Sequence, residues 1–169
     1  LIIMAIKKAG IIGKYTDHNN IDFYLCVIGN EAGKLGFPKG HLEINEKPIE
    51  CAQRECYEET GIKVQLTGDI AYGNNQTVYY SHRFESMPKP NPQDLVEVRE
   101  VKWISLLELL GTNFNMFNTD LKKYVKNFLI DNDGFITIVN NKKPKPMKKQ
   151  CAFFIRGDCK KGSICDYSH

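Results

Sequence analysis

Residues 40–62 read GHLEINEKPIECAQRECYEETGI, and the fold prediction starts from this stretch. Pro48 suits the first turn of a helix, and Gly61 suits the position just after the last turn. Between them, apolar residues recur at helical spacing, which predicts one helix over residues 48–59. The apolar positions are Ile49, Ala52 and Cys56.

Three glutamates of this helix lie three and four positions apart, so one face of the helix gathers Glu55, Glu58 and Glu59. Carboxylates this close repel one another unless a cation joins them. Mg²⁺ and similar hard cations take oxygen ligands and share them with substrate phosphates. The pattern therefore predicts a divalent-cation site. The alternative, a solvated helix rich in glutamate, is disfavoured by the flanking glycines and by Arg54.

The spacing of the whole stretch resembles the Nudix box, in which a glycine is followed by a glutamate, an arginine–glutamate pair, two more glutamates, a glycine and an aliphatic residue. The matching positions are Gly40, Glu46, Arg54, Glu55, Glu58, Glu59, Gly61 and Ile62. Cys56 is a less usual occupant of its apolar position. The resemblance implies an α/β fold, the Nudix α/β/α sandwich with a mixed sheet, and hydrolysis of a phosphoanhydride bond with Mg²⁺ or Mn²⁺.

The resemblance also implies roles for single residues. Glu58 and Glu59 would ligate the metal, and Glu55 would ligate it or assist the general base. Arg54 would pair with a carboxylate and hold it in register. The implied metal set is Gly40, Glu55, Glu58, Glu59 and Glu97, and the implied catalytic set is Glu55, Glu97 and Arg54.

Two further segments narrow the substrate. GFPKGH at residues 36–41 looks like the corresponding segment of cellular and viral mRNA-decapping enzymes, and its PKGH part is also similar to diadenosine tetraphosphate hydrolases. VEVREVKWISL at residues 96–106 resembles a decapping-enzyme strand in which one glutamate serves as metal ligand or base. Trp103 sets the frame that maps this glutamate to Glu97, with Glu100 as an adjacent competitor.

Other residues near these motifs are candidate substrate contacts. Lys39 would meet substrate phosphates at the mouth of the site as a point charge. Tyr79 and Tyr80 alternate along a strand, so one of them faces the substrate side and stacks on a base, or both serve core packing. His41 borders the box and is worth testing. The lone residues His18, His82, Cys26, Cys51 and Cys56 are expected in loops or in the core.

The remainder of residues 1–141 is expected to complete one Nudix domain. Strand-like stretches occupy residues 1–6, 23–28, 62–66, 76–84 and 96–104, and a short amphipathic helix occupies residues 120–130. Gly10 and Gly13 interrupt the first stretch. Residues 1–6 are much shorter than the roughly 20 apolar residues of a bilayer span, so no membrane partner is expected.

Beyond residue 141 the composition changes. Residues 142–169 hold eight Lys or Arg against two Asp, a charge of +6, which leaves 3 − 6 = −3 for residues 1–141. Residues 142–150, KKPKPMKKQ, have the composition of a semi-extended basic linker. This asymmetry favours an acidic catalytic body with a basic arm for nucleic acid, and a solvated linker is the alternative.

Residues 151–169 carry Cys151, Cys159, Cys165 and His169 at a spacing that resembles CCCH zinc fingers of RNA-binding proteins. Three thiolates and one imidazole form a closed, structural Zn²⁺ site. Stacking on aromatic side chains beside a basic groove would bind single-stranded RNA. The expected RNA contacts are Phe153, Phe154, Arg156, Lys160, Lys161 and Tyr167. A zinc knob that contacts protein is the alternative.

Together these motifs predict an mRNA 5′-cap hydrolase that releases 7-methyl-GDP and 5′-monophosphate RNA. The alternatives are a hydrolase of small nucleoside or inositol polyphosphates and a non-catalytic module that binds cap or RNA. Cysteines grouped with a terminal histidine favour metal binding in a reducing compartment, so a cytoplasmic location is expected. The oligomeric state stays open.

Overall fold

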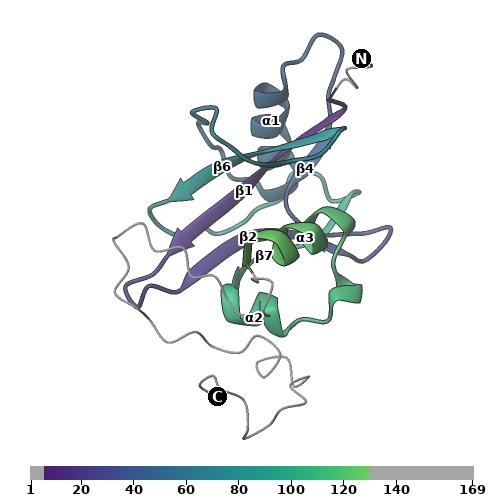
Figure 1. The fold of residues 1–169 in the computed structure, drawn as a ribbon. Coiled ribbons are helices and arrows are strands. Elements are labelled where there is room, and N and C mark those ends of the chain that lie inside the picture. Colours follow the sequence, from purple (N-terminus) through teal and green to yellow (C-terminus); the bar gives the residue numbers. More distant parts are fainter. Residues whose placement is uncertain (1–5, 130–169) are drawn as a thin grey trace, which may run out of the picture. The chain divides into compact units, whose positions relative to one another are not determined.

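A computed structural model of the chain describes residues 6–129, which divide between Leu106 and Leu107 into two compact units. Within the described part of the first unit, seven strands form one sheet (Figure 1). Their bounds are β1 Lys8–Thr16, β2 Asp22–Gly29, β3 Leu35–Gly36, β4 Lys39–His41, β5 Ile70–Gly73, β6 Thr77–Phe84 and β7 Val98–Ser105.

The sheet is mixed, which confirms the predicted α/β class. Its strand order is β3-β2-β1-β6-β5, with β4 paired to β1 and β7 paired to β2. The long central pair, β1 with β6, is parallel, and the other pairs are antiparallel. A mixed sheet needs a long crossover between its parallel strands, and the segment between β1 and β6 contains the glutamate helix.

β1 shares one of its edges between two partners. Its first residues pair with β4, Ala9 opposite Gly40, and its last residues pair with β2. Close approach is possible because Gly10 has no side chain: a Cβ atom there would overlap the carbonyl of Pro38. The β1–β4 pairing sets Gly40 at the point where the helix crosses the sheet.

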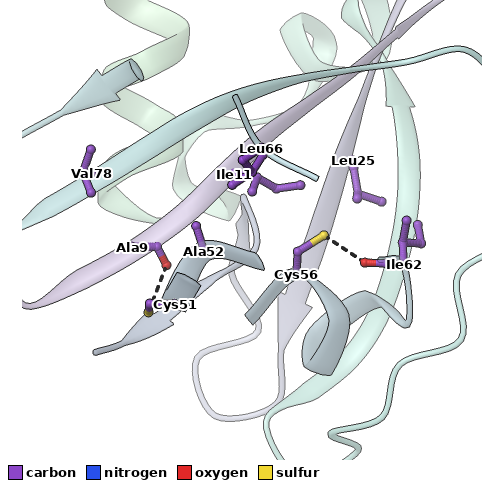
Figure 2. Close-up of a cluster of buried hydrophobic side chains, with 9 residues drawn as sticks. All are labelled: Ala9, Ile11, Leu25, Cys51, Ala52, Cys56, Ile62, Leu66 and Val78. Carbon is purple, nitrogen blue, oxygen red and sulfur yellow. Dashed lines mark hydrogen bonds between the residues drawn. The ribbon is translucent and has the colours of Figure 1, made fainter. Parts of the chain in front are cut away.

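Helix α1 (Pro48–Thr60) packs on one face of this sheet against β1 and β4. The predicted helix, residues 48–59, is thus confirmed to within one residue. Figure 2 shows the cluster of side chains between helix and sheet. Small residues on the helix let it lie close to the strands. The buried members are Ala9, Ile11, Leu25, Cys51, Ala52, Cys56, Ile62, Leu66 and Val78.

The three described cysteines are buried, as expected of small core residues. In α1, the Cys56 thiol donates to the carbonyl of Ile62 at 3.3 Å, and the Cys51 thiol lies 4.0 Å from the carbonyl of Ala9. Burial raises the pKa of both thiols to about 12. They therefore stay neutral at physiological pH and serve packing.

The end of α1 is tied to a distant segment. Gly61 adopts φ 73°, the left-handed conformation of a helix C-cap, and its N–H donates to the Tyr57 carbonyl at 2.7 Å. The carbonyl of Thr60 accepts the N–H of Asn91 at 2.8 Å. The chain between β6 and β7 is therefore bonded to the last turn of the helix.

The described part of the second unit is helical. It contains α2 (Leu106–Gly111), the 3-10 turn η1 (Phe114–Met116), α3 (Thr119–Tyr124) and its π-helical continuation η2 (Val125–Leu129). The side chain of Asn118 caps α3 by accepting the N–H of Leu121 at 2.9 Å. Among residues 6–129, none of the helices has the length and apolar character that crossing a bilayer requires.

Two sequence predictions are wrong. Gly10 and Gly13 were expected to interrupt a strand, but β1 (Lys8–Thr16) runs straight through both, because these glycines permit close approach rather than end the strand. Residues 62–66 form no strand. Their apolar side chains cover the helix–sheet core, and the N–H of Leu66 donates to the side chain of Gln53 at 2.9 Å instead of to a neighbouring strand.

Several predictions lie outside the described residues. They concern most of the first predicted strand, the basic linker at residues 142–150, the four zinc ligands and the RNA contacts. The ligands are Cys151, Cys159, Cys165 and His169. The contacts are Phe153, Phe154, Arg156, Lys160, Lys161 and Tyr167.

Gly61→Ala is expected to destabilise the protein more than Gly68→Ala, although both glycines have positive φ, 73° and 98°. Both changes strain the backbone. At Gly61 the new Cβ would also overlap the backbone of Asn91, whereas at Gly68 nothing lies within 4 Å. The extra loss in the free energy of unfolding should be about 1–3 kcal/mol in urea titrations. Equal losses of unfolding free energy in the two variants would contradict the close contact between Asn91 and the end of α1.

Candidate active site

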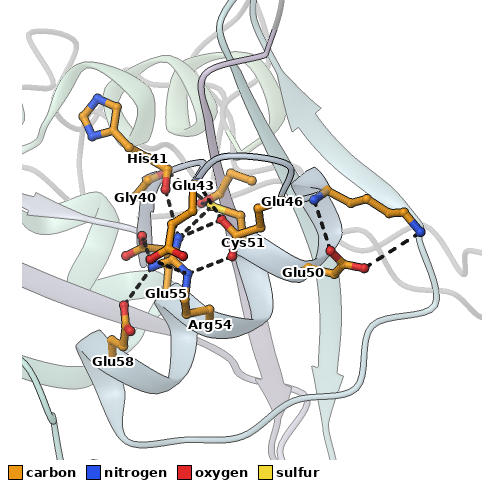
Figure 3. A network of polar contacts seen from close by, with 11 residues as sticks. Gly40, His41, Glu43, Glu46, Glu50, Cys51, Arg54, Glu55 and Glu58 are labelled. Carbon is orange, nitrogen blue, oxygen red and sulfur yellow. Dashed lines mark hydrogen bonds and ion pairs between the residues drawn. The ribbon is translucent and has the colours of Figure 1, made fainter.

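The guanidinium of Arg54 lies at the centre of the site (Figure 3). It forms a bidentate pair with Glu46, Nε to Oε1 at 2.8 Å and Nη2 to Oε2 at 2.9 Å. Nη2 also donates to the carbonyl of His41 at 2.9 Å, which fixes the arginine to β4. Hydrogen bonding by Arg54 lowers the pKa of Glu46 to about 2. Glu46 therefore stays ionised and anchors the arginine.

The same guanidinium holds two carboxylates of α1. Its Nη1 lies 2.7 Å from Glu55 Oε1 and 2.9 Å from Glu58 Oε2. One positive charge thus contacts three carboxylates, counting Glu46. These contacts offset the repulsion that the helical spacing of the glutamates creates, and they raise the pKa of Arg54 above its ordinary value.

Glu55 is buried against β4, with 8% of its surface exposed. A Cβ atom on Gly40 would overlap the carboxyl group of Glu55, so glycine is needed at that position for the carboxylate to lie there. Burial raises the pKa of Glu55, the hydrogen bond from Arg54 opposes this, and the charges of Glu58 and Glu97 add to the rise. The first glycine of the box therefore makes room for the Glu55 carboxylate.

Glu59 is buried to a similar degree, with 9% exposed. Its Oε2 accepts the backbone N–H of Lys39 at 2.8 Å. Burial raises its pKa to about 8, against the lowering effect of that hydrogen bond and of the Lys39 charge, and the charges of Glu55 and Glu97 raise it further. A negative charge on Glu59 therefore has too little compensation from the protein alone.

The donors fit a hard divalent cation in their chemistry, because they are oxygen atoms on one helix face and Glu59 lacks a full counter-charge. Their side chains do not form a preassembled set of metal ligands. Within residues 6–129, no three His, Cys, Asp or Glu side chains form a group that could hold a metal ion. Glu55 and Glu58 turn to Arg54, and Glu59 turns to the Lys39 amide. Arg54 pairs with helix carboxylates, as the box implies, and the metal-ligand set stays a prediction.

The structure separates the two candidate glutamates near β7. Glu97 lies in the turn just before the strand, and its charge acts on both Glu55 and Glu59. Glu100 lies within the strand, and its Oε1 is 3.7 Å from the ammonium of Lys102. Glu97 therefore belongs to the same acidic group as the helix glutamates, whereas Glu100 forms a local ion pair on the strand.

The remaining candidates have different positions. Lys39 lies in β4, where its charge lowers the pKa of Glu59, so it borders the acidic group. Tyr79 is fully buried, with its ring 6.0 Å from Phe37 and 5.9 Å from Tyr72. It has no exposed surface for a base to stack on, so the core-packing alternative describes it. Tyr80 packs beside the helix–sheet core.

Glu46 is the residue whose importance the sequence prediction understated, since it was placed in the box without a role. Its bidentate contact with Arg54 fixes the arginine that in turn contacts Glu55 and Glu58. The available signal was the spacing of the box, which places Glu46 in the loop ahead of the helix. Spacing alone does not reveal a contact across that loop.

Glu59→Gln is expected to stabilise the protein in EDTA at high pH and to have no such effect at pH 4. The pKa of Glu59 is about 8 in the fold against an ordinary 4.5. Below pH 4.5 the carboxyl is protonated both folded and unfolded, whereas above it the folded state alone resists ionisation, so stability falls as pH rises toward 8. The gain at pH 8 should be on the order of a few kcal/mol, read from melting curves.

The exposed Glu31→Gln is the matched control for that measurement and should show no pH-dependent gain. A gain for Glu59→Gln that is the same at pH 4 and pH 8 would contradict the assigned ionisation.

Comparison with known proteins identifies the family. Residues 18–128, more than half of the chain, match the NUDIX domain. Over 131 residues, 73% of this chain, the sequence is 23% identical to mRNA-decapping enzyme subunit 2 of Saccharomyces cerevisiae strain YJM789. The chain spans only 13% of that protein's length. A shorter stretch of 61 residues, 36% of each chain, is 39% identical to the 111R protein of Invertebrate iridescent virus 3.

Solved structures agree on the fold. A NUDIX-family hydrolase from Clostridium perfringens superposes with a TM-score of 0.55 and 18% identity, covering 73% of this chain and 93% of the other. The residues of the family match include α1 with its glutamates and the strands from β2 to β7. The chain therefore belongs to the Nudix family, and it carries a Nudix phosphoanhydride hydrolase domain.

Proposed function

We propose that this domain removes the 5′ cap of mRNA by cleaving the triphosphate bridge, which releases 7-methyl-GDP and 5′-monophosphate RNA. The observation that carries the proposal is the similarity to the yeast decapping enzyme, which extends over 131 residues. The charge of Glu97 acts on Glu55 and Glu59, which supports the proposal, because the decapping-like segment at residues 96–106 supplies that glutamate.

The proposed cation, Mg²⁺ or Mn²⁺, would be held by Glu55, Glu58 and Glu59 together with Glu97 and the carbonyl of Gly40. When bound, it supplies charge neutralisation for phosphate oxygens and lowers the pKa of a coordinated water. Arg54, anchored by Glu46, limits how far the helix carboxylates can move.

Two residues of the chain would act on the substrate directly. Lys39 borders the acidic group and would offer its ammonium to the phosphate chain, which carries more negative charge than a single lysine offsets. Glu97 or Glu55 would accept a proton from the attacking water as general base. Burial raises the pKa of Glu55, which is the direction that favours a proton acceptor.

The C-terminal residues would hold the transcript. In this proposal Cys151, Cys159, Cys165 and His169 bind Zn²⁺ and order the segment, since 19 residues bury too little apolar surface to fold alone. The aromatic residues would stack on bases, and the basic linker at residues 142–150 would contact phosphates. The partners would be capped RNA and single-stranded RNA. The protein would act in the cytoplasm.

Turnover should be highest on long capped RNA when cap-labelled RNA, free cap analogue and diadenosine tetraphosphate are compared with Mg²⁺ or Mn²⁺. Glu58→Gln should lower the rate on capped RNA by at least about 100-fold, because it removes a proposed ligand of the ion that neutralises the phosphates. Glu50→Gln, on the first turn of the same helix and outside the acidic group, is the matched control.

The outcomes separate the competing functions. Faster cleavage of diadenosine tetraphosphate or of free cap analogue would overturn decapping in favour of small polyphosphates. Absence of turnover on all three substrates would indicate a binding module. Wild-type rates in Glu58→Gln would remove that residue from the proposed ligand set.

Cys165→Ser should abolish zinc retention and weaken binding of single-stranded RNA by about tenfold or more, the value of losing a stacked base. Hydrolysis of free cap analogue should stay unchanged. Ser168→Ala, in the same segment, is the matched control. Zinc analysis and fluorescence anisotropy with labelled RNA provide the measurements. Equal RNA affinity in Cys165→Ser would contradict an RNA-binding finger.

A further inference from the structure

The turn that carries Glu97 is held by an unusual number of hydrogen bonds. Asp94 begins it, and its Oδ1 accepts the N–H of Val96 at 2.9 Å and the N–H of Glu97 at 3.0 Å. Its carbonyl accepts the N–H of Val98 at 3.2 Å, where β7 starts. The backbone on both sides of Glu97 is therefore bonded to Asp94.

Asn30, at the end of β2, holds the same turn from the other side. Its side-chain amide donates to the carbonyl of Leu95 at 3.1 Å and to the carbonyl of Val96 at 2.8 Å. Its backbone N–H donates to the carbonyl of Glu97 at 2.8 Å. Asp94 thus binds the amides of the turn, and Asn30 binds its carbonyls.

The turn is also attached to the catalytic helix. The N–H groups of Gln93 and Asp94 both donate to the carbonyl of Glu58, at 2.8 and 2.9 Å. Glu58 belongs to the last turn of α1, which also presents Glu59. Any shift of the turn relative to the helix carboxylates would therefore break backbone hydrogen bonds.

Sheet pairing ends at the same place. Ile28 lies opposite Glu100, but Gly29 lies opposite Val98, so Arg99 is an extra residue in β7. Such a bulge interrupts the ladder and redirects the strand. Glu97 comes immediately before Val98 and lies outside the ladder, so strand pairing does not orient it. The hydrogen bonds of the turn must orient it instead.

Apolar burial does not hold the turn either. Leu95 is 72% exposed and Val96 is 84% exposed. Because these side chains project into solvent, the conformation depends on the polar contacts of Asp94 and Asn30. This isolates the two residues as the groups that determine where Glu97 points.

We propose that Asp94 and Asn30 are positioning residues that hold the Glu97 carboxylate at the cation site of the helix glutamates. The inference rests on the proposed function in that it gives Glu97 a part in cation binding. It goes further by assigning the orientation of Glu97 to two residues outside the Nudix box, one of them 67 positions away in the sequence (97 − 30 = 67).

The test is a double-mutant cycle on the full chain, read as Mn²⁺ affinity by electron paramagnetic resonance. Asp94→Ala and Asn30→Ala are made with Glu97 intact and again with Glu97→Gln. With Glu97 intact, each should weaken Mn²⁺ binding about 10-fold, as loss of a supporting contact does at metal sites. With Glu97→Gln neither should cause further loss, because the carboxylate they position is gone.

Asp94→Asn is the matched control. Its amide oxygen can still accept both N–H groups, so Mn²⁺ affinity should remain near wild type. Melting curves are recorded for every variant. Asn30→Ala removes the side-chain donors to the carbonyls of Leu95 and Val96 without adding charge, so it provides a second route if Asp94→Ala unfolds.

Three results would overturn the proposal. Equal losses of Mn²⁺ affinity with and without Glu97 would show a general structural role. Wild-type Mn²⁺ affinity in Glu97→Gln would remove Glu97 from the cation site, and wild-type affinity in both turn variants would remove the positioning role. Failure of the decapping proposal is distinguishable, because lack of turnover on capped RNA does not alter the Mn²⁺ titration.

Discussion

The contact of one guanidinium with three carboxylates is the interaction on which the rest of the site depends. Arg54 bonds Glu46, Glu55 and Glu58 while only 24% of its side chain is exposed. Removing one partner of such a partly buried ionic group leaves the others uncompensated, which costs more than the pair contributes. The helix can therefore present several glutamates to one side because an arginine on the same helix holds them.

Two carboxyl groups of this site have pKa values shifted in opposite directions. Glu46 accepts two hydrogen bonds from Arg54 and has a pKa of about 2, whereas burial raises the pKa of Glu59 to about 8. The first carboxylate is fully satisfied by the protein and serves as an anchor. The second lacks positive charge, which is the condition under which a carboxylate gains most from a cation. Environment, rather than residue type, divides the anchoring from the binding role.

Contacts across the sheet bring further residues to the Arg54 network. Pairing of β4 with β1 brings Gly40 against Glu55, and the turn before β7 brings Glu97 to the same group. One contact joins residues 15 positions apart (55 − 40 = 15), and the other joins residues 42 apart (97 − 55 = 42). The chain thus assembles its acidic group from a helix, a short strand and a turn, and each is fixed by backbone hydrogen bonds.

The sequence alone determined α1, its glutamates and the role of its cysteines in packing, because helical spacing and capping act over a few residues. It also indicated Glu97, through a local motif. Only the tertiary structure decided that β1 runs through Gly10, that Tyr79 is buried and that Arg54 contacts three carboxylates at once. These outcomes depend on which surfaces meet across the fold. Contacts between segments distant along the chain leave no periodic trace in the sequence.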